Sequence, residues 1–397
     1  MSRRLRRQRG FTLIEVMVAG LIGVISIAVA AKVAQVVIKQ SARGRERTDF
    51  HSRTHSVTQQ LRADIRVAGL GSTGAIAFVD PAAGIPFVNV RYQTPNGYWA
   101  IPAVTGETNV GAVAAGGLTV RANSDLLQLV VPDPSSSAVS AGFGRQGNST
   151  MAMLPYNAGA DPALPAPAQI VPPCAAAGRL VYIVDNSGPS GAGRVLVAFL
   201  AGWDATGITI LAGATGFPFT VAPGARVMCA RISTYFVDSN GWLVRSDIDD
   251  TGDAAAIVQG RVMVATATNL QNAISPGVED FQIALGMSAD YQRYIGAPLD
   301  ITTSWLFTNP AGVAAPNGGT AAGWSDVRAV RFNVLARTLR KIIDTTQVAH
   351  PAAREDGTPP QLLSRGHGVD WITSTEVMMS LKYYDENAPQ NLVADPF

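Results

Sequence analysis

The sequence predicts an α+β protein. One long N-terminal α-helix, with a transmembrane half and an amphipathic half, should pack on an antiparallel, β-rich C-terminal domain with large loop insertions. Three observations support this prediction. An apolar run of about 20 residues begins at Phe11, apolar residues then recur at helical spacing, and the remainder consists of short apolar segments separated by many of the 39 Gly and 24 Pro residues.

The apolar run covers residues 11–31, which is long enough to cross a bilayer as a helix. Residues 1–10 precede it and contain five arginines. By the positive-inside rule these arginines hold the N-terminus in the cytoplasm and direct the rest of the chain outward. An ordinary secretory signal has a shorter apolar core and then an A-x-A-like cleavage site, and no such site follows this run.

A single carboxylate, Glu15, lies inside the apolar run. A charged side chain in hydrocarbon costs about 2.5–3.5 kcal/mol on the milder insertion scales, so a carboxylate there favours a cationic partner. Cleavage after Gly10 would create such a cation, because Phe11 would then carry a free, positively charged amino group. A plain membrane anchor explains the length of the run but leaves Glu15 unexplained.

The helix is predicted to continue to about Ala68 and to end at residues 69–72, which contain two glycines. Beyond Lys32 one face becomes apolar at helical spacing, while the other faces carry mainly arginines. The members of this stripe are Phe50, Val57, Leu61, Ile65 and Ala68. The outer half should therefore lie on a domain, and the inner half should stand free in lipid or in a fibre core. At 1.5 Å per residue the whole helix is about 85 Å long.

Three parts follow from these patterns: a leader at 1–10, a helix at 11–70 and a β-rich domain at 71–397 with an insertion around 100–225. Residues 132–173 are rich in Ala, Gly, Ser and Pro and should form a long loop. Asn240-Gly241 predicts a hairpin turn. The expected strands are 85–92, 125–131 ending at Pro132, 179–184, 195–200, 208–211, 226–237, 242–245, 277–285, 326–337 and a terminal strand at 375–383.

The chain has two cysteines, Cys174 and Cys229. An exported chain meets an oxidising compartment, so a disulfide is the favoured interpretation. It would close a loop of about 55 residues and contribute on the order of 4 kcal/mol in the chain-entropy model. The alternative is a pair of buried free thiols, and two cysteines alone cannot form a structural zinc site.

Composition argues against nucleic-acid binding and against an enzyme. The 397 residues carry 31 basic and 29 acidic side chains, and removal of the five leader arginines leaves 26 against 29, a net charge of −3. Neither G-x-S-x-G nor H-E-x-x-H occurs. The four histidines leave the long middle of the chain without one, and they are His51, His55, His350 and His367. We therefore expect no catalytic site, no metal site and no small-molecule cofactor.

Three weaker motifs have simpler interpretations. Gly142–Gly147 matches G-x-G-x-x-G but lacks the flanking strand and helix of a dinucleotide site, so a flexible loop is expected. Asp247–Asp253 begins like a calcium loop, but Val258 stands where the bidentate glutamate belongs, which favours an acidic turn. His51 and His55 are four residues apart without a further His or Cys nearby, so we expect solvent-exposed surface there.

The N-terminal segment resembles the class III leader of type IV pilins and of the pseudopilins of type II secretion. Gly10 stands before the cut, Phe11 becomes the first mature residue and Glu15 becomes the fifth. The resemblance implies that prepilin peptidase cleaves after Gly10 and methylates the Phe11 amine, and that Glu15 neutralises the terminal amine of an adjacent subunit. Lys32 stands where major pilins commonly carry a helix-bending proline, which favours a minor pilin.

Three later segments are similar to PilW-type minor pilins: the hairpin at 232–245, the segment 277–285 and the segment 327–335. The resemblance implies a priming complex with other minor pilins and the major pilin, built on an inner-membrane assembly platform, with a tip adhesin as a further allowed partner. The chain would cross the inner membrane once with its domain in the periplasm, and would reach the pilus tip after assembly. Residues 100–225 lie outside the resemblance.

Two alternatives remain open at this point. One is a minor pseudopilin of a type II secretion system, similar to the J-type subunit, although such subunits are usually smaller. The other is a membrane-anchored periplasmic binding protein or enzyme. This last alternative predicts no cut after Gly10 and tolerance of Glu15→Leu.

Overall fold

The structure is a computed structural model, and it describes most of the helix and the strands that follow it. The described ranges are 11–72, 75–79, 92–93, 99–110, 113–115, 118–122, 124–153, 174–185, 194–204, 207–212, 216–251, 256–259, 262–265, 271–287, 305–306, 327–339 and 369–377. The predicted leader lies outside these ranges. So do the predicted strand at 85–92 up to Arg91 and the part of the predicted terminal strand beyond Val377.

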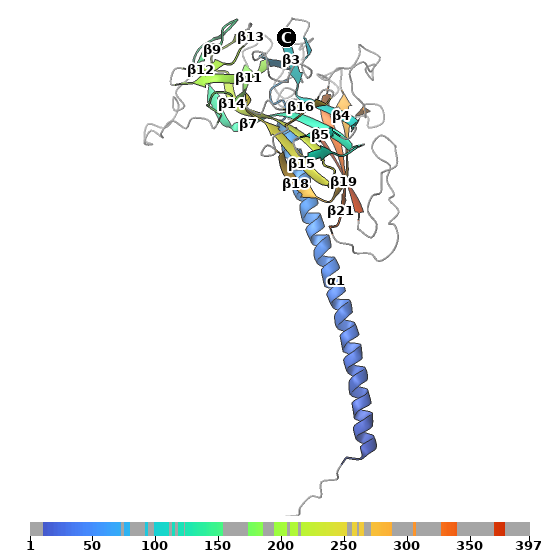
Figure 1. Ribbon diagram of the computed structural model, residues 1–397. Helices are drawn as coiled ribbons and strands as arrows, with labels where there is room; N and C mark the ends of the chain where they lie inside the picture. The colour runs from blue at the N-terminus through green and yellow to red at the C-terminus, as the bar shows by residue number, and fades with distance from the viewer. Residues whose placement is uncertain are drawn as a thin grey trace, which may run out of the picture.

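The predicted N-terminal helix is present as α1, Leu13–Val67. Figure 1 shows it as a single rod that projects from the strand-rich part of the molecule. At its C-terminal end the Ala68 N–H donates to the Asp64 carbonyl over 2.9 Å. Gly69 and Gly71 then adopt positive φ angles of 64° and 79°, a conformation that glycine tolerates best. These two glycines end the helix and turn the chain towards the first strand.

Only the second half of α1 is packed. All five residues of the predicted stripe are buried: Phe50, Val57, Leu61, Ile65 and Ala68. Two threonines extend the buried face, and their hydroxyls donate to the carbonyls four residues earlier, from Thr54 to Phe50 over 2.7 Å and from Thr58 to Thr54 over 2.9 Å. These hydrogen bonds satisfy the hydroxyls inside the core.

Twelve of the described strands form one sheet. Its main path is β18-β15-β14-β10-β11-β1-β3-β2, with β7 and β4 joined through β14, and β12 and β9 joined through β11. Their bounds are β1 Ala75–Phe78, β2 Tyr92–Gln93, β3 Trp99–Pro102, β4 Val104–Val110, β7 Ser124–Val139, β9 Thr150–Ala152, β10 Leu180–Asp185, β11 Arg194–Trp203, β12 Gly207–Ile210, β14 Arg226–Val237, β15 Trp242–Ile248 and β18 Gln271–Pro276. The β1–β11 pair is parallel, so this sheet is mixed and not wholly antiparallel as expected.

A second sheet has four strands in the order β20-β19-β21-β22. Their bounds are β19 Val278–Met287, β20 Trp305–Leu306, β21 Val327–Arg337 and β22 Val369–Val377. Three short pairs complete the described strands: β5 Val113–Ala115 with β6 Leu118–Val120, β8 Gly144–Gln146 with β13 Gly216–Val221, and β16 Ala256–Gln259 with β17 Val262–Ala265. Helix α1 lies against β7 and β18 of the large sheet and against β21 and β22 of the smaller one. The helix therefore connects the two sheets.

Several predicted strands are confirmed, including 226–237 as β14. The hairpin predicted at Asn240-Gly241 joins β14 to β15, with Gly241 at a φ of 78°. The predicted terminal strand was placed too late. Strand β22 begins at Val369, and it pairs with β21 from Arg337 opposite Val369 to Ala329 opposite Val377.

The prediction that a strand ends at Pro132 was wrong, and so was the predicted loop as far as Met153; its remainder, residues 154–173, lies outside the described ranges. Strand β7 continues through Pro132 and Pro134 to Val139, and β8 and β9 follow it. Beyond Leu129, β7 pairs with β14 but no longer with β4. A proline is tolerated there because its missing N–H removes no hydrogen bond on the open side. Gly142–Gly147 is likewise not a simple flexible loop, because Gly144–Gln146 pairs with β13.

The large sheet is buried on both faces. On β11 the alternate residues Val195, Val197 and Phe199 face a core shared with α1 and the smaller sheet. Their neighbours Leu196, Ala198 and Leu200 face a second core that includes residues of β9, β12 and β13. A strand covered on both sides reads as a continuous apolar run, which is the pattern of residues 195–200. Figure 1 shows β9, β12 and β13 at the end of the domain away from the projecting helix.

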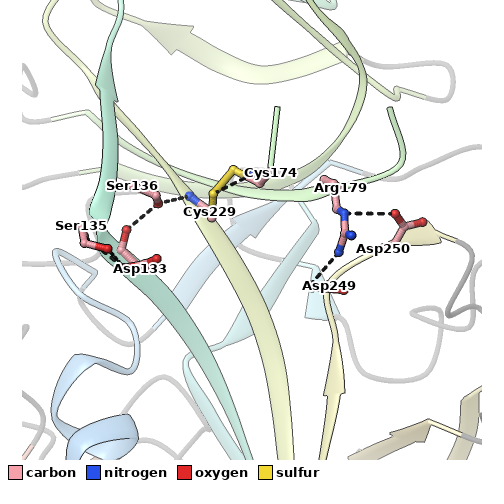
Figure 2. The surroundings of a disulfide bond; sticks show 8 residues. All are labelled: Asp133, Ser135, Ser136, Cys174, Arg179, Cys229, Asp249 and Asp250. Carbon is pink, nitrogen blue, oxygen red and sulfur yellow. Dashed lines mark hydrogen bonds and ion pairs between the residues drawn. A yellow bond between two sulfur atoms is a disulfide. The ribbon is translucent and has the colours of Figure 1, made fainter. Parts of the chain in front are cut away.

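The predicted disulfide is present between Cys174 and Cys229, with Cα atoms 5.3 Å apart (Figure 2). Cys229 belongs to β14, and its N–H donates to Ser136 Oγ on β7 over 2.8 Å. The Ser136 hydroxyl donates in turn to the Asp133 carbonyl over 2.7 Å. The disulfide and these hydrogen bonds anchor Cys174, which precedes β10, at the irregular stretch where β7 and β14 shift register.

Replacing both cysteines by serine should lower the free energy of unfolding by about 2–5 kcal/mol, because the unfolded chain loses a cross-link over a separation of 55 residues. Denaturant titration of the full chain in detergent measures this change. Reductant should shift the midpoint of the wild-type protein towards that of the double variant and leave the double variant unchanged. A wild-type midpoint that does not move after verified reduction would contradict a stabilising role.

Candidate functional site

The N-terminal end of α1 is closed by a reciprocal pair of hydrogen bonds between Thr12 and Glu15. The Glu15 N–H donates to Thr12 Oγ1 over 3.3 Å, and the Thr12 N–H donates to Glu15 Oε2 over 2.9 Å. The Thr12 hydroxyl also donates to the same carboxylate oxygen over 3.0 Å. This arrangement is a capping box, and it fixes the direction of the Glu15 side chain at the first turn of the helix.

No positive charge in the described part of the chain neutralises Glu15. The carboxylate has hydrogen bonds from Thr12 but no ion pair there, and the helix around it is entirely exposed. Each large apolar side chain from Phe11 to Ile38 is at least half exposed, and Phe11 itself is 86% exposed. This half of α1 is long and apolar enough to cross a membrane. The helix therefore offers a bare apolar surface with one uncompensated carboxylate near its start.

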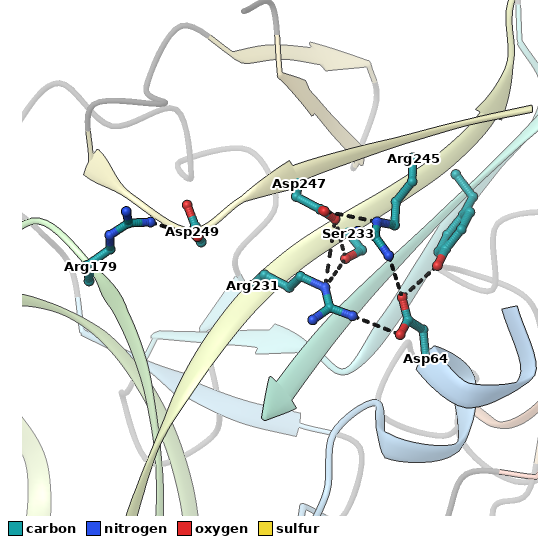
Figure 3. Close-up of polar contacts among 8 residues, drawn as sticks. Asp64, Arg179, Arg231, Ser233, Arg245, Asp247 and Asp249 are labelled. Carbon is teal, nitrogen blue, oxygen red and sulfur yellow. Dashed lines mark hydrogen bonds and ion pairs between the residues drawn. The ribbon is translucent and has the colours of Figure 1, made fainter. Parts of the chain in front are cut away.

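The other end of α1 is attached to the domain through a second carboxylate, Asp64, which is buried (Figure 3). Asp64 Oδ1 accepts from Arg231 over 2.8 Å, and Asp64 Oδ2 accepts from the Tyr235 hydroxyl over 2.6 Å. Arg245 approaches Asp64 Oδ2 at 3.8 Å. All three partners lie on the β14–β15 hairpin, so this cluster joins the helix to the centre of the large sheet.

A further carboxylate balances the charge of this cluster. Asp247 accepts from Arg245 over 2.9 Å and from the Ser233 hydroxyl over 2.7 Å. Burial and the neighbouring Asp64 carboxylate raise the pKa of Tyr235 well above its ordinary value of 10.0, so its phenol stays protonated and donates. We call Asp64, Arg231, Tyr235, Arg245 and Asp247 the helix-anchoring cluster. Its two carboxylates and two guanidinium groups balance in charge and bind one another or Tyr235, as a structural contact requires.

The acidic stretch at 247–253 is engaged with arginines in its described part. Asp249 and Asp250 both pair with Arg179, at 2.7 Å and 3.4 Å (Figure 2). Asp247 belongs to the helix-anchoring cluster. These ion pairs support the interpretation of an acidic turn. The carboxylates of Asp247, Asp249 and Asp250 pair with arginines of the same chain.

The described residues around the remaining weak motifs form no arrangement typical of a catalytic or ligand-binding site. His51 and His55 are exposed on α1, and His55 Nε2 lies 3.4 Å from Gln59 Nε2. Gly142–Gly147 contains strand β8 and leads into no helix. Within the described ranges, no group of three or more His, Cys, Asp or Glu side chains is placed to hold a metal ion.

Two features of this site were not predicted from the sequence. The pattern Thr12-x-x-Glu15 is the capping-box signature and could have been recognised directly. Asp64 interrupts an otherwise apolar helical stripe, which signals a buried polar contact, but the sequence does not reveal that its partners lie about 170 residues away on β14 and β15.

Residues 5–31 match the family described as the prokaryotic N-terminal methylation motif. This segment is a type IV pilin or pseudopilin signal. It includes Gly10, Phe11, Thr12 and Glu15, and it covers the exposed start of α1. No curated protein and no solved structure matches the chain. The motif therefore indicates a membrane-anchored, pilin-like protein, and the domain has to be interpreted from its own residues.

Replacing Asp64 by Asn should lower the free energy of unfolding by about 1.5–3 kcal/mol, because Arg231 and Tyr235 lose a charged acceptor beneath the helix. Asp49→Asn is the matched control, since Asp49 lies exposed on the same helix and should change stability by less than about 0.5 kcal/mol. Denaturant titration of both variants gives the comparison. Equal effects of the two substitutions would show that the cluster does not anchor the helix.

Proposed function

We propose that this protein is a minor pilin of the type IV pilus. In this proposal prepilin peptidase cleaves after Gly10 and methylates the amine of Phe11. The mature chain then enters a priming complex with other minor pilins through α1, starts assembly of the major pilin on the inner-membrane platform and remains at the pilus tip. The protein acts as a structural subunit and not as an enzyme.

The observation that carries the proposal is the position of Glu15 on the bare half of α1. Its hydrogen bonds from Thr12 direct the carboxylate but supply no positive charge. A charged group at this depth is costly unless a cation pairs with it. The methylated amine of a neighbouring subunit supplies that cation when helices pack side by side, and it thereby sets the register between subunits.

The two halves of α1 suit this assembly. The exposed half presents apolar side chains all round, which adjacent helices can cover in a fibre core as lipid covers them in a membrane. The buried half is held by the helix-anchoring cluster and by its apolar stripe. A subunit can therefore move from membrane to fibre without any change in how its domain is attached.

The segments that resemble PilW-type minor pilins lie together next to the helix. They correspond to the β14–β15 hairpin and to β19 and β21, which pair with each other. The Val278 N–H, at the start of β19, donates to the Gly241 carbonyl in the hairpin turn over 2.9 Å. Their joint position supports the proposal that the part of the domain close to the helix is the part shared with PilW-type minor pilins. Strands β9, β12 and β13, from the region without resemblance, build the distal end.

A minor pseudopilin of a type II secretion system is the second candidate, because the matched signal is shared by pilins and pseudopilins. The two functions differ in where the processed chain accumulates. A pilus subunit is recovered from fibres sheared off the cell surface, whereas a pseudopilin stays with the cell envelope.

Glu15→Gln should reduce recovery of this chain in sheared fibres about ten-fold, which corresponds to the loss of about 1.4 kcal/mol of pairing between subunits. The domain should fold normally, because Glu15 makes no contact with it. Asp49→Asn removes the same charge outside the apolar run and should leave recovery unchanged. Quantitative immunoblotting of sheared and membrane fractions measures both. Normal fibre numbers and normal recovery of the Glu15 variant would contradict the proposal.

A further inference from the structure

The exposed half of α1 carries a basic stripe in line with the buried face of the same helix. Lys32, Lys39, Arg43 and Arg47 are all exposed, and each stands 18 residues before a buried stripe residue: Phe50, Val57, Leu61 and Ile65 respectively. Eighteen residues are about five turns of α-helix. The four cations therefore lie on the same side of the helix as the buried stripe, and this is the side that faces the domain.

The opposite side of this part of the helix has a different character. Ala34, Val37 and Ser41 lie between a third and half of a turn away from the centre of the basic stripe, and Arg45 is the one cation on that side. Four of the five cations between residues 32 and 48 thus lie on one side of the helix. This segment touches no other described part of the chain until Glu46. Glu46 lies on the basic side, but its carboxylate already accepts from the Leu339 N–H over 2.7 Å.

The four stripe cations make no ion pair or hydrogen bond with the described residues. Their position relative to the membrane indicates which anions are close enough to bind them. Lys32 directly follows the apolar run that ends at Ala31, so it stands at the outer edge of the hydrocarbon. Lys39 and Arg43 stand about 10 and 17 Å beyond Lys32 along the axis of the helix. A tilt towards the domain side, within the 0–40° range of membrane helices, lowers both side chains to the lipid headgroups.

The base of the domain adds apolar contacts on the same side. Trp242 and Leu339 are 39% and 47% exposed, which is unusual for large apolar side chains in this domain. Leu339 is tied to Glu46, and Trp242 pairs with Pro276, whose carbonyl accepts from Arg53. Both residues therefore belong to the part of the domain that first meets the helix. Tryptophan in particular favours the membrane–water interface.

We infer that Lys32, Lys39 and Arg43, the part of the stripe nearest the apolar run, bind the phosphate headgroups of anionic phospholipids on the outer face of the inner membrane. This contact holds the subunit tilted, with Trp242 and Leu339 against the lipid surface, before the subunit is assembled. It requires only that α1 spans the membrane. It is independent of cleavage after Gly10 and of fibre assembly, so it can fail while the proposed function stands.

The test measures the association of lipids with the full chain reconstituted in phosphatidylcholine vesicles. Spin-labelled phosphatidylglycerol and spin-labelled phosphatidylcholine report the relative association constants of the two headgroups. Arg43→Gln and Arg45→Gln form a matched pair, because they remove the same charge two residues apart on opposite sides of the helix. Both variants retain the five leader arginines, so any lipid bound by the leader cancels in the comparison.

Arg43→Gln should weaken the preference for phosphatidylglycerol about five-fold at low salt, whereas Arg45→Gln should change it far less. Lys32→Gln combined with Lys39→Gln and Arg43→Gln should abolish the part of the preference that added salt screens. Brominated phosphatidylglycerol should quench wild-type tryptophan fluorescence more strongly than that of the Trp242→Phe variant.

Equal effects of the matched pair, or an unchanged preference in the triple variant, would overturn the inference. If the triple variant keeps its lipid preference but loses binding to other purified minor pilins, the stripe binds an acidic protein surface instead of lipid.

Discussion

The bare apolar surface of α1 is the constraint on which the rest of the molecule depends. Every large apolar side chain from Phe11 to Ile38 is at least half exposed, and burying each one is worth about 1.5–3 kcal/mol. The described part of the domain leaves this surface exposed. A bilayer or a bundle of similar helices can cover it, and the domain has to leave this half of the helix free for both environments.

Two carboxylates on the same helix show how the two halves differ. Asp64 is buried beneath the domain and meets Arg231, Arg245 and Tyr235, so its charge is compensated within the chain. Glu15 has its hydrogen bonds from Thr12, but no cation in the described part of the chain reaches it. The first carboxylate fixes a domain to a rod. The second leaves a charge for another molecule to neutralise, and this difference supports assembly as the role of the exposed half.

The helix could be predicted closely from the sequence because its signals are local: an apolar run, a stripe at helical spacing and terminal glycines. The strands were predicted where apolar runs are continuous, as in β10, β11 and β14. The extension of β7 through Pro132 was missed because it depends on the loss of β4 as a neighbour, which is a long-range property. The helix-anchoring cluster was not predicted for the same reason, because Asp64 and Arg231 are 167 residues apart in the sequence. Thr12 was overlooked although its capping-box signature is local.

The most direct test of this account is the chemical identity of the N-terminus of the chain in cells. Mass spectrometry of the protein from sheared fibres and from membranes, analysed separately, reports both the cut and its modification. We expect an N-methylated Phe11 in the sheared fraction. A chain that retains residues 1–10 in both fractions, or one that is cut at another position, would mean that Glu15 has no terminal amine to meet and would contradict the account.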